Sequence, residues 1–145
     1  GGAFKQDDLL KEQLPLKFPS DAFMLQQLKR IAKIFPDSPL YIFIFTDDLD
    51  PAGLARHYAE KLNEPRAVFD FRKTNHLSAD EKMLSDFYSF KNFDCLLRPI
   101  SHFSFIAGKL GRFSLEISPC HYYMNNEEEC VYDQTELYFS GGITK

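Results

Sequence analysis

Three short polar segments each follow a predicted strand, and their side chains are of kinds that bind phosphate or transfer protons. Residues 46–48 (Thr-Asp-Asp) follow the first strand, residues 72–76 (Arg-Lys-Thr-Asn-His) the second, and residues 98–104 (Arg-Pro-Ile-Ser-His-Phe-Ser) the third. In open parallel sheets, ligands bind beyond the carboxyl ends of the strands. We therefore expect these segments to contribute to a ligand site.

The segment 98–104 suggests the most specific chemistry. Ser101 and Ser104 stand at the predicted start of a helix, where free backbone N–H groups and the positive end of the helix dipole favour phosphate. Arg98 can add a bidentate contact to the same group. The spacing also fits a purely structural role, in which Ser101 caps the helix and Arg98 lies on the surface. Both interpretations stay open at this point.

The acidic residues after the first strand fit two further kinds of site. Asp47, Asp48 and Asp50 can together bind a metal ion, and Asp48 with Asp50 has the spacing of phosphatases that use an aspartate nucleophile. That phosphatase pattern continues with Thr or Val where this chain has Ala52. Asp50 is also the predicted cap of the next helix. We therefore favour neither site.

The elements that would position these segments alternate along the chain. Helical spacing of apolar residues predicts helices over residues 22–35, 51–62, 79–90 and 102–110. Apolar runs predict strands over residues 40–45, 67–71, 93–97 and 113–118. This alternation indicates an α/β fold, a Rossmann-like three-layer domain with a mostly parallel sheet of four or more strands. Residues 120–145 are expected to pack back onto it as an extension.

Composition and charge exclude several classes of protein. The 145 residues hold 17 Lys and Arg against 21 Asp and Glu, a net charge of −4, without a basic stripe for nucleic acid. No apolar run approaches the roughly 18 residues of a membrane span. The first residues lack the apolar core of a signal peptide, which favours a cytoplasmic location. Four scattered histidines do not form a zinc pattern. The three cysteines are expected to be reduced thiols, and a disulfide between Cys120 and Cys130 is the alternative that their spacing leaves open.

Two motifs, taken in order, resemble a known family. YIFIFTDD (residues 41–48) precedes a helix, and Asp86 on a later helix is followed eight residues on by Asp94, before a strand. Phe103-Ser104 then follow that strand. This order resembles the nucleotide-binding half of the α1,6-type fucosyltransferases, including the Nod-factor enzymes, over roughly residues 40–110. The resemblance implies half of a two-Rossmann-domain glycosyltransferase that uses GDP-fucose or a related GDP-sugar.

The resemblance also implies residue roles. Asp86 would accept two hydrogen bonds from guanine, Ser101 and Ser104 would hold the diphosphate, and Thr46 and Asp48 would position the sugar or nearby loops. Transfer would be a direct inverting displacement without a metal or cofactor, and His102 and Asp48 are the candidates for a general base. The donor-binding residues implied are Thr46, Asp47, Asp48, Asp86, Arg98, Ser101, His102, Phe103 and Ser104.

The front of the chain departs from the family pattern. The family carries a His-x-Arg-x-Gly strand whose Arg binds the donor phosphates, and only Gly1-Gly2 could be its tail. We therefore expect a carboxyl-terminal piece of a larger transferase, inactive alone, whose glycan or other acceptor is bound mainly by a missing domain. One alternative is a non-catalytic α/β domain that binds a nucleotide or a partner, and another is a different small α/β enzyme.

Overall fold

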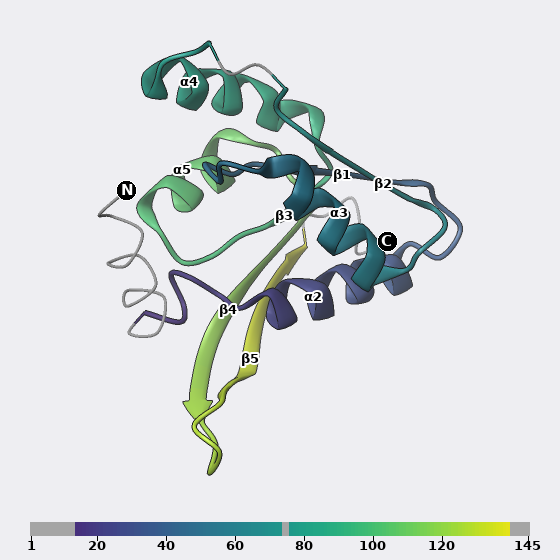
Figure 1. Ribbon diagram of the computed structural model, residues 1–145, viewed down its shortest axis with the longest axis vertical. Helices are drawn as coiled ribbons and strands as arrows, with labels where there is room; N and C mark the ends of the chain where they lie inside the picture. Colours follow the sequence, from purple (N-terminus) through teal and green to yellow (C-terminus); the bar gives the residue numbers. More distant parts are fainter. Residues whose placement is uncertain (1–13, 74–75, 140–145) are drawn as a thin grey trace. The chain divides into compact units, whose positions relative to one another are not determined.

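The computed structural model describes residues 14–73 and 76–139 (Figure 1). The chain divides into two compact units, which we name the hairpin unit (Gly1–Met24 with Phe87–Lys145) and the parallel-pair unit (Leu25–Asp86). In chain order the elements are α2 (Asp21–Ile34), β1 (Leu40–Ile44), α3 (Pro51–Leu62), β2 (Ala67–Phe71), α4 (Ala79–Ser89), the 3₁₀ turn η1 (Phe90–Asn92), β3 (Cys95–Leu97), α5 (His102–Leu110), β4 (Leu115–Met124) and β5 (Cys130–Phe139).

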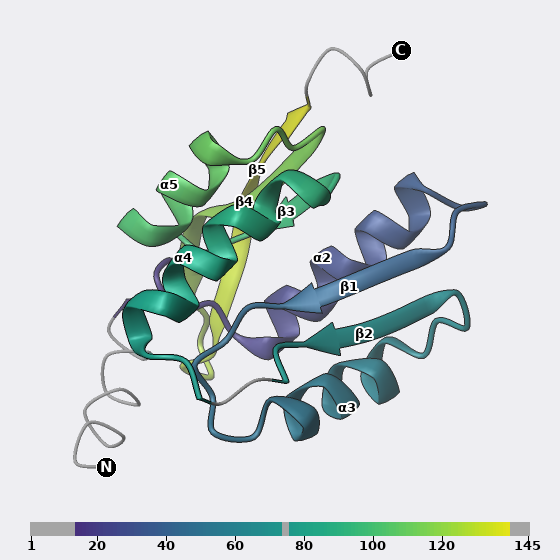
Figure 2. The ribbon, with the colours of Figure 1, turned by 90° about the horizontal axis from the view of Figure 1, so that it is seen from above.

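The strands of the described residues form two small sheets. β1 pairs in parallel with β2 in the parallel-pair unit, as Figure 2 shows. In the hairpin unit, β3 pairs in parallel with β4, and β4 pairs antiparallel with β5. The mixed α/β class is thus confirmed. The four predicted strands are found, but not as one mostly parallel sheet of four or more.

The β4–β5 hairpin is the largest difference from the sequence-based expectation. β4 continues past the predicted end at residue 118 to Met124, and β5 returns beside it (Figure 1). The turn between them is closed by the Asn125 side-chain oxygen, which accepts the backbone N–H groups of Glu127 at 3.0 Å and Glu129 at 2.8 Å. Residues 120–139, expected only to pack back as an extension, therefore contribute two paired strand segments.

In the parallel-pair unit, α3 begins and ends as its sequence predicts. Asp50 accepts the backbone N–H of Gly53 at 3.0 Å, Pro51 occupies the first turn, and Asn63 ends the helix in the left-handed region at φ 49°. Figure 2 shows α3 alongside β2. Its buried residues lie on one helix face: Ala55, Tyr58 and Leu62.

The strands of this unit are less covered than expected. An apolar run such as residues 40–45 is typical of a parallel strand buried on both faces, but Tyr41 is 56% exposed, and its register partner Val68 is 61% exposed. The Tyr41 hydroxyl donates to Asp70 Oδ2 at 2.8 Å on the neighbouring strand. This hydrogen bond is the largest cause of the lowered pKa of Asp70. Polar contact therefore replaces apolar burial at this position.

Arg66 links the end of α2 to the start of β2. Its guanidinium donates to the carbonyl oxygens of Ala32 at 3.0 Å, Phe35 at 2.5 Å and Ser38 at 3.0 Å. It also pairs with Glu64 at 2.9 Å, and this hydrogen bond lowers the pKa of the Glu64 carboxyl. Carbonyl groups at a helix end have no partner within the helix, and here one arginine supplies donors for them.

In the hairpin unit, Tyr132 of β5 holds the segment that precedes α2. Its ring centroid is 4.8 Å from that of Phe23, its hydroxyl donates to the Pro15 carbonyl at 2.9 Å, and it accepts the Ser20 N–H at 3.2 Å. Burial raises the pKa of Tyr132 to about 12. Ser20 also accepts the N–H of Phe23 at 3.2 Å, as a helix cap does.

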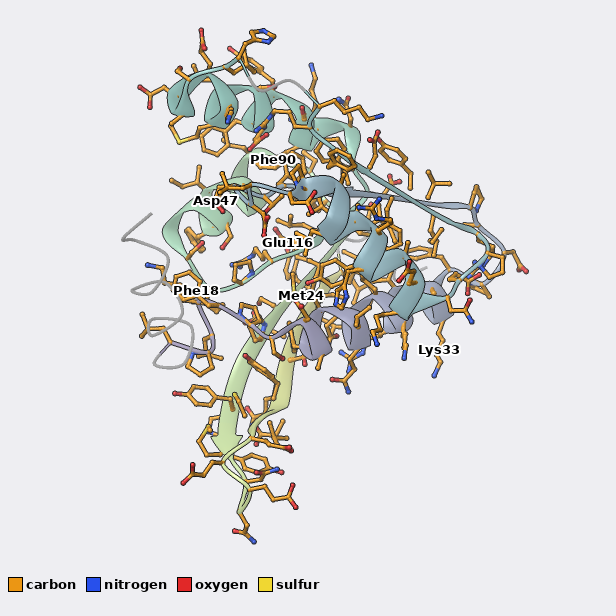
Figure 3. The ribbon with its side chains drawn as sticks, in the orientation of Figure 1. Phe18, Met24, Lys33, Asp47, Phe90 and Glu116 are labelled. Carbon is orange, nitrogen blue, oxygen red and sulfur yellow. The ribbon has the colours of Figure 1, made fainter. Side chains whose placement is uncertain are left out.

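Phenylalanines form much of the core of this unit, as the composition suggests. Phe90, labelled in Figure 3, is 2% exposed, and its ring centroid lies 6.3 Å from that of Phe113. Leu115 and Ile117 of β4 are fully buried. Side chains alternate between the two faces of a strand, so Glu116 between them faces the other way.

Candidate functional site

The segment after β3 leads directly into α5, as predicted. The Arg98 N–H donates to the Ile117 carbonyl at 2.9 Å, which extends the pairing of β3 with β4 by one residue. Ser101 then caps α5: its Oγ accepts the N–H of Ser104 at 3.1 Å, and Ser104 Oγ accepts the N–H of Ser101 at 3.2 Å. This reciprocal pair is a capping box.

Both serine hydroxyls are used within this cap. Ser101 Oγ donates to Ser104 Oγ at 2.9 Å, and Ser104 Oγ donates to the Pro99 carbonyl at 2.7 Å. Ser104 is also buried, at 5% exposure. The capping interpretation of Ser101 is thus confirmed, and binding of phosphate by these hydroxyls stays a prediction. His102 and Phe103 form the first positions of α5, where backbone N–H groups have no partner within the helix.

The segment after β1 is a chain of local turns that leads into α3. Thr46 Oγ1 accepts the N–H of Asp48 at 3.0 Å, and Asp48 Oδ1 accepts the N–H of Asp50 at 2.8 Å. Asp47, labelled in Figure 3, is exposed. These contacts hold the loop, and a ligand role for Thr46, Asp47 and Asp48 stays a prediction. Among the described residues, no three His, Cys, Asp or Glu side chains are grouped to hold a metal ion.

Asp86, the residue expected to contact guanine, forms an ion pair with Arg72 in the same unit. Both side chains are mostly covered, with 13% of Asp86 and 19% of Arg72 exposed. Arg72 also donates to the Lys82 carbonyl at 3.1 Å, so it fastens α4 to the segment after β2. Residues 74–75 of the predicted segment 72–76 lie outside the described residues.

A pocket of about 400 Å³ lies in the hairpin unit, between α5 and the β4–β5 hairpin. In the strand register Glu116 pairs with Tyr138 and Ser118 with Glu136, so these four side chains share one face of the hairpin. The lining residues are Arg98, Phe105, Gly108, Lys109, Glu116, Ser118, Glu136 and Tyr138. Glu116 is labelled in Figure 3.

Two charged groups in this pocket have incomplete hydrogen bonding. Arg98 Nε and Glu116 Oε1 are covered by protein and have no hydrogen-bond partner. Both atoms lie beside Gly108, since a Cβ there would be 2.4 Å from Glu116 Oε1 and 3.7 Å from Arg98 Nε. A donor and an acceptor without partners therefore lie near one another, and the absence of a side chain at Gly108 lets the Glu116 carboxylate lie against α5.

Aromatic side chains form other parts of the pocket wall. Phe105 is 54% exposed and Tyr138 is 62% exposed. The Arg98 Cζ lies 6.0 Å and the Lys109 Nζ 5.2 Å from the Phe105 ring centroid, within reach of a cation–π attraction. The pocket thus combines flat apolar surface with cationic and anionic groups, a combination suited to a flat polar ligand.

The predicted residues of segment 98–104 do not all lie together. Ser101 and Ser104 contact each other at the start of α5, whereas Arg98 Nε lies near Gly108 in the last turn of that helix. Glu116 was missed by the sequence reasoning. The available signal was one carboxylate among the apolar residues of the predicted strand 113–118.

The chain matches no known family model, no curated protein and no solved structure. Within residues 14–73 and 76–139, helices of the length and apolarity that a bilayer crossing requires are not found.

Proposed function

We propose that the chain is the donor-nucleotide-binding domain of a GDP-sugar-dependent glycosyltransferase, with GDP-fucose or a related sugar nucleotide as donor. One observation carries the proposal: the loop after parallel strand β3 enters the capped N-terminus of α5 directly. A diphosphate binds favourably at such a junction, because the first backbone N–H groups of the helix and its dipole both favour negative charge.

The proposal assigns separate tasks to the residues of this loop. Ser101 and Ser104 shape the N-terminus of α5, and the backbone N–H groups of His102 and Phe103 contact the diphosphate. The same N–H groups would stabilise the charge that develops on GDP as it leaves during an inverting displacement. His102 and Asp48 remain the candidates for a general base, and the acceptor, a glycan or another hydroxyl compound, would be bound by a further domain.

A Rossmann-like fold is part of the same proposal. Among the described residues, β1 and β3 each pair with one strand only. A further parallel strand paired with β1 would enlarge the first sheet, and one paired with β3 would enlarge the second. A Rossmann-like fold has a larger parallel sheet of this kind. The resemblance places a strand with an arginine in such a position.

The alternative is a non-catalytic α/β domain that binds a nucleotide or a partner. It is favoured by the internal contacts of the predicted donor residues: Asp86 pairs with Arg72, and the hydroxyls of Ser101 and Ser104 are used within the cap. Both hypotheses include a binding site, and only the first includes sugar transfer.

Calorimetric titration with GDP, GDP-fucose and ADP, each with and without Mg²⁺, tests the proposal. We expect GDP and GDP-fucose to bind without Mg²⁺. A chain that binds none of these nucleotides would overturn the proposal, and Mg²⁺-dependent release of phosphate would instead indicate a phosphatase.

A pair of variants tests the role of the helix N-terminus. His102→Pro removes one backbone N–H at the first position of α5, where proline is well tolerated, and Ser101 at φ −150° and ψ 160° already has the extended backbone that precedes proline. His102→Ala keeps that N–H. We expect the proline variant to weaken GDP binding by about tenfold, the value of a hydrogen bond to a charged group, and the alanine variant to bind GDP normally.

A further inference from the structure

We propose that the pocket of Arg98 and Glu116 recognises the edge of a guanine ring, where a carbonyl oxygen stands next to a ring N–H. This inference rests on the proposed function, because it assigns the base of the proposed nucleotide to a site. It names Glu116 as the carboxylate that contacts guanine, in place of Asp86.

The hydrogen-bonding character of the two groups selects the ligand. A guanidinium can only donate hydrogen bonds, and an ionised carboxylate can only accept them. A ligand that contacts both must present an acceptor to Arg98 and a donor to Glu116, close together. Guanine offers its O6 acceptor beside its N1–H and N2–H donors, and uracil offers O4 beside N3–H but has no second donor. The GDP donor of the proposed function therefore decides in favour of guanine. Adenine has a donor amino group where guanine has O6, and its ring N1 is an acceptor, so it would set donor against donor and acceptor against acceptor.

The contacts of the two groups within the chain leave capacity for a ligand. Arg98 Nε and Glu116 Oε1 have no hydrogen-bond partner, and the guanidinium makes one long contact, from Nη1 to the Pro99 carbonyl at 3.4 Å. Both side chains line the pocket and are partly exposed, so the remainder of each group can reach a bound molecule. Because Arg98 Nε and Glu116 Oε1 are themselves covered by protein, a ligand would contact the terminal guanidinium nitrogens of Arg98 and Oε2 of Glu116.

The aromatic wall fits the rest of the base. Phe105 and Tyr138 are each more than half exposed although they are large and apolar, and both line this pocket. Purine rings stack on such side chains in other proteins. Lys109, near the Phe105 ring, adds a positive charge on the same helix. Because α5 carries both Phe105 of this wall and the proposed diphosphate site at its N-terminus, one elongated nucleotide can contact two parts of one helix.

Asp86 is a weaker candidate in this structure. Its carboxylate already pairs with Arg72, and its side chain is 13% exposed. The ion pair would have to break before Asp86 could accept two hydrogen bonds from a base. Substitutions at Asp86 and at Glu116 therefore have different expected effects on base preference.

The experiment compares GDP, inosine diphosphate and ADP by calorimetric titration. Inosine diphosphate keeps O6 and N1–H but lacks the amino group of guanine, so it isolates the proposed edge. For the natural chain we expect GDP and inosine diphosphate to bind at least about tenfold more tightly than ADP. Glu116→Gln should reduce that preference about tenfold without changing ADP binding. Glu127→Gln, the same change in the exposed hairpin turn, is the matched control.

Different outcomes separate this inference from the proposed function. Equal binding of GDP and ADP overturns the guanine assignment and leaves nucleotide binding in place. If Asp86→Asn loses the preference for GDP over ADP while Glu116→Gln keeps it, the guanine assignment of Glu116 is overturned and Asp86 takes its place. Absence of binding by all three nucleotides overturns both proposals. If Glu116→Gln does not fold, Gly108→Ala, whose methyl group displaces the same carboxylate, should abolish the preference instead.

Discussion

Gly108 offers a test of the local geometry that needs no ligand. It lies on α5, and an added methyl group would be 2.4 Å from Glu116 Oε1 and 3.4 Å from Glu116 Cδ. The first distance is too short for non-bonded atoms, so in Gly108→Ala the carboxylate must move. The obstructing atoms belong to the flexible end of a side chain, so backbone rearrangement is not required.

Two opposing effects set the stability of Gly108→Ala. Alanine in place of glycine inside a helix is favourable by about 0.8–1 kcal/mol. Moving Glu116 into a less favourable side-chain conformation costs about 0.5–1.5 kcal/mol. The free energy of unfolding should therefore stay within about 1 kcal/mol of the natural chain, since the two effects nearly cancel.

The assay is urea unfolding of the natural chain, Gly108→Ala, Glu116→Ala and the double variant, followed by circular dichroism. With Glu116 already truncated, the added methyl meets no carboxylate, and the substitution at Gly108 should show the full helix gain of about 1 kcal/mol. The gain should be smaller by about 0.5–1.5 kcal/mol when Glu116 is present.

Equal effects of the Gly108 substitution with and without Glu116 would refute the reasoning. That result would mean that the carboxylate does not lie against the helix at this position. The pocket described here would then have a different wall, and the guanine assignment would lose its geometric support. The same samples give both stability and nucleotide affinity, so a loss of binding can be separated from a loss of folding.

Two further predictions concern titrating side chains. The pKa of Tyr132 rises from 10.0 to about 12 on folding, mainly through burial. The contribution of neutral Tyr132 to stability is therefore complete below pH 10.0 and is lost as the pH rises toward 12. Tyr132→Phe should show a smaller fall in unfolding free energy over that range, and an unchanged fall would contradict the contacts of Tyr132. Burial also raises the pKa of Cys95 to about 11, whereas Cys120 is exposed. Iodoacetamide at about pH 8 should therefore modify Cys120 faster, as peptide mass spectrometry can measure, and equal rates would count against the burial of Cys95.

Local signals allowed accurate prediction of the helices. Asp50 with Pro51, Ser78 with Glu81, and Ser101 before α5 all act as caps in the structure. Each of these contacts joins residues three positions apart or fewer, so both partners of the interaction can be recognised from a short stretch of sequence. The ends of α2, α3 and α5 accordingly lie within one residue of those predicted.

Strand pairing could not be predicted in the same way, because it depends on contacts between distant residues. The β4–β5 turn also lacks the Asn-Gly or Asp-Gly pair of the commonest hairpin turns, and its only sequence signal is the pair Asn125-Asn126. It contains neither glycine nor proline between residues 125 and 129, and its left-handed position, at φ 59°, is taken by Glu128. The acidic run 127–129 is exposed in the structure, and its role in reversing the chain was not predicted.

The chemistry of the candidate pocket follows from the packing of the strand beneath it. Leu115 and Ile117 are fully buried, and this fixes which face of β4 enters the core. A shift of one residue in register would bury Glu116 and expose both apolar neighbours, which is strongly unfavourable. The hydrophobic effect therefore holds the Glu116 carboxylate on the face that meets α5, and Gly108 lets it approach the helix. A charged residue inside an apolar strand is in this case a consequence of alternation, and the burial of its two neighbours determines the face from which it approaches Gly108.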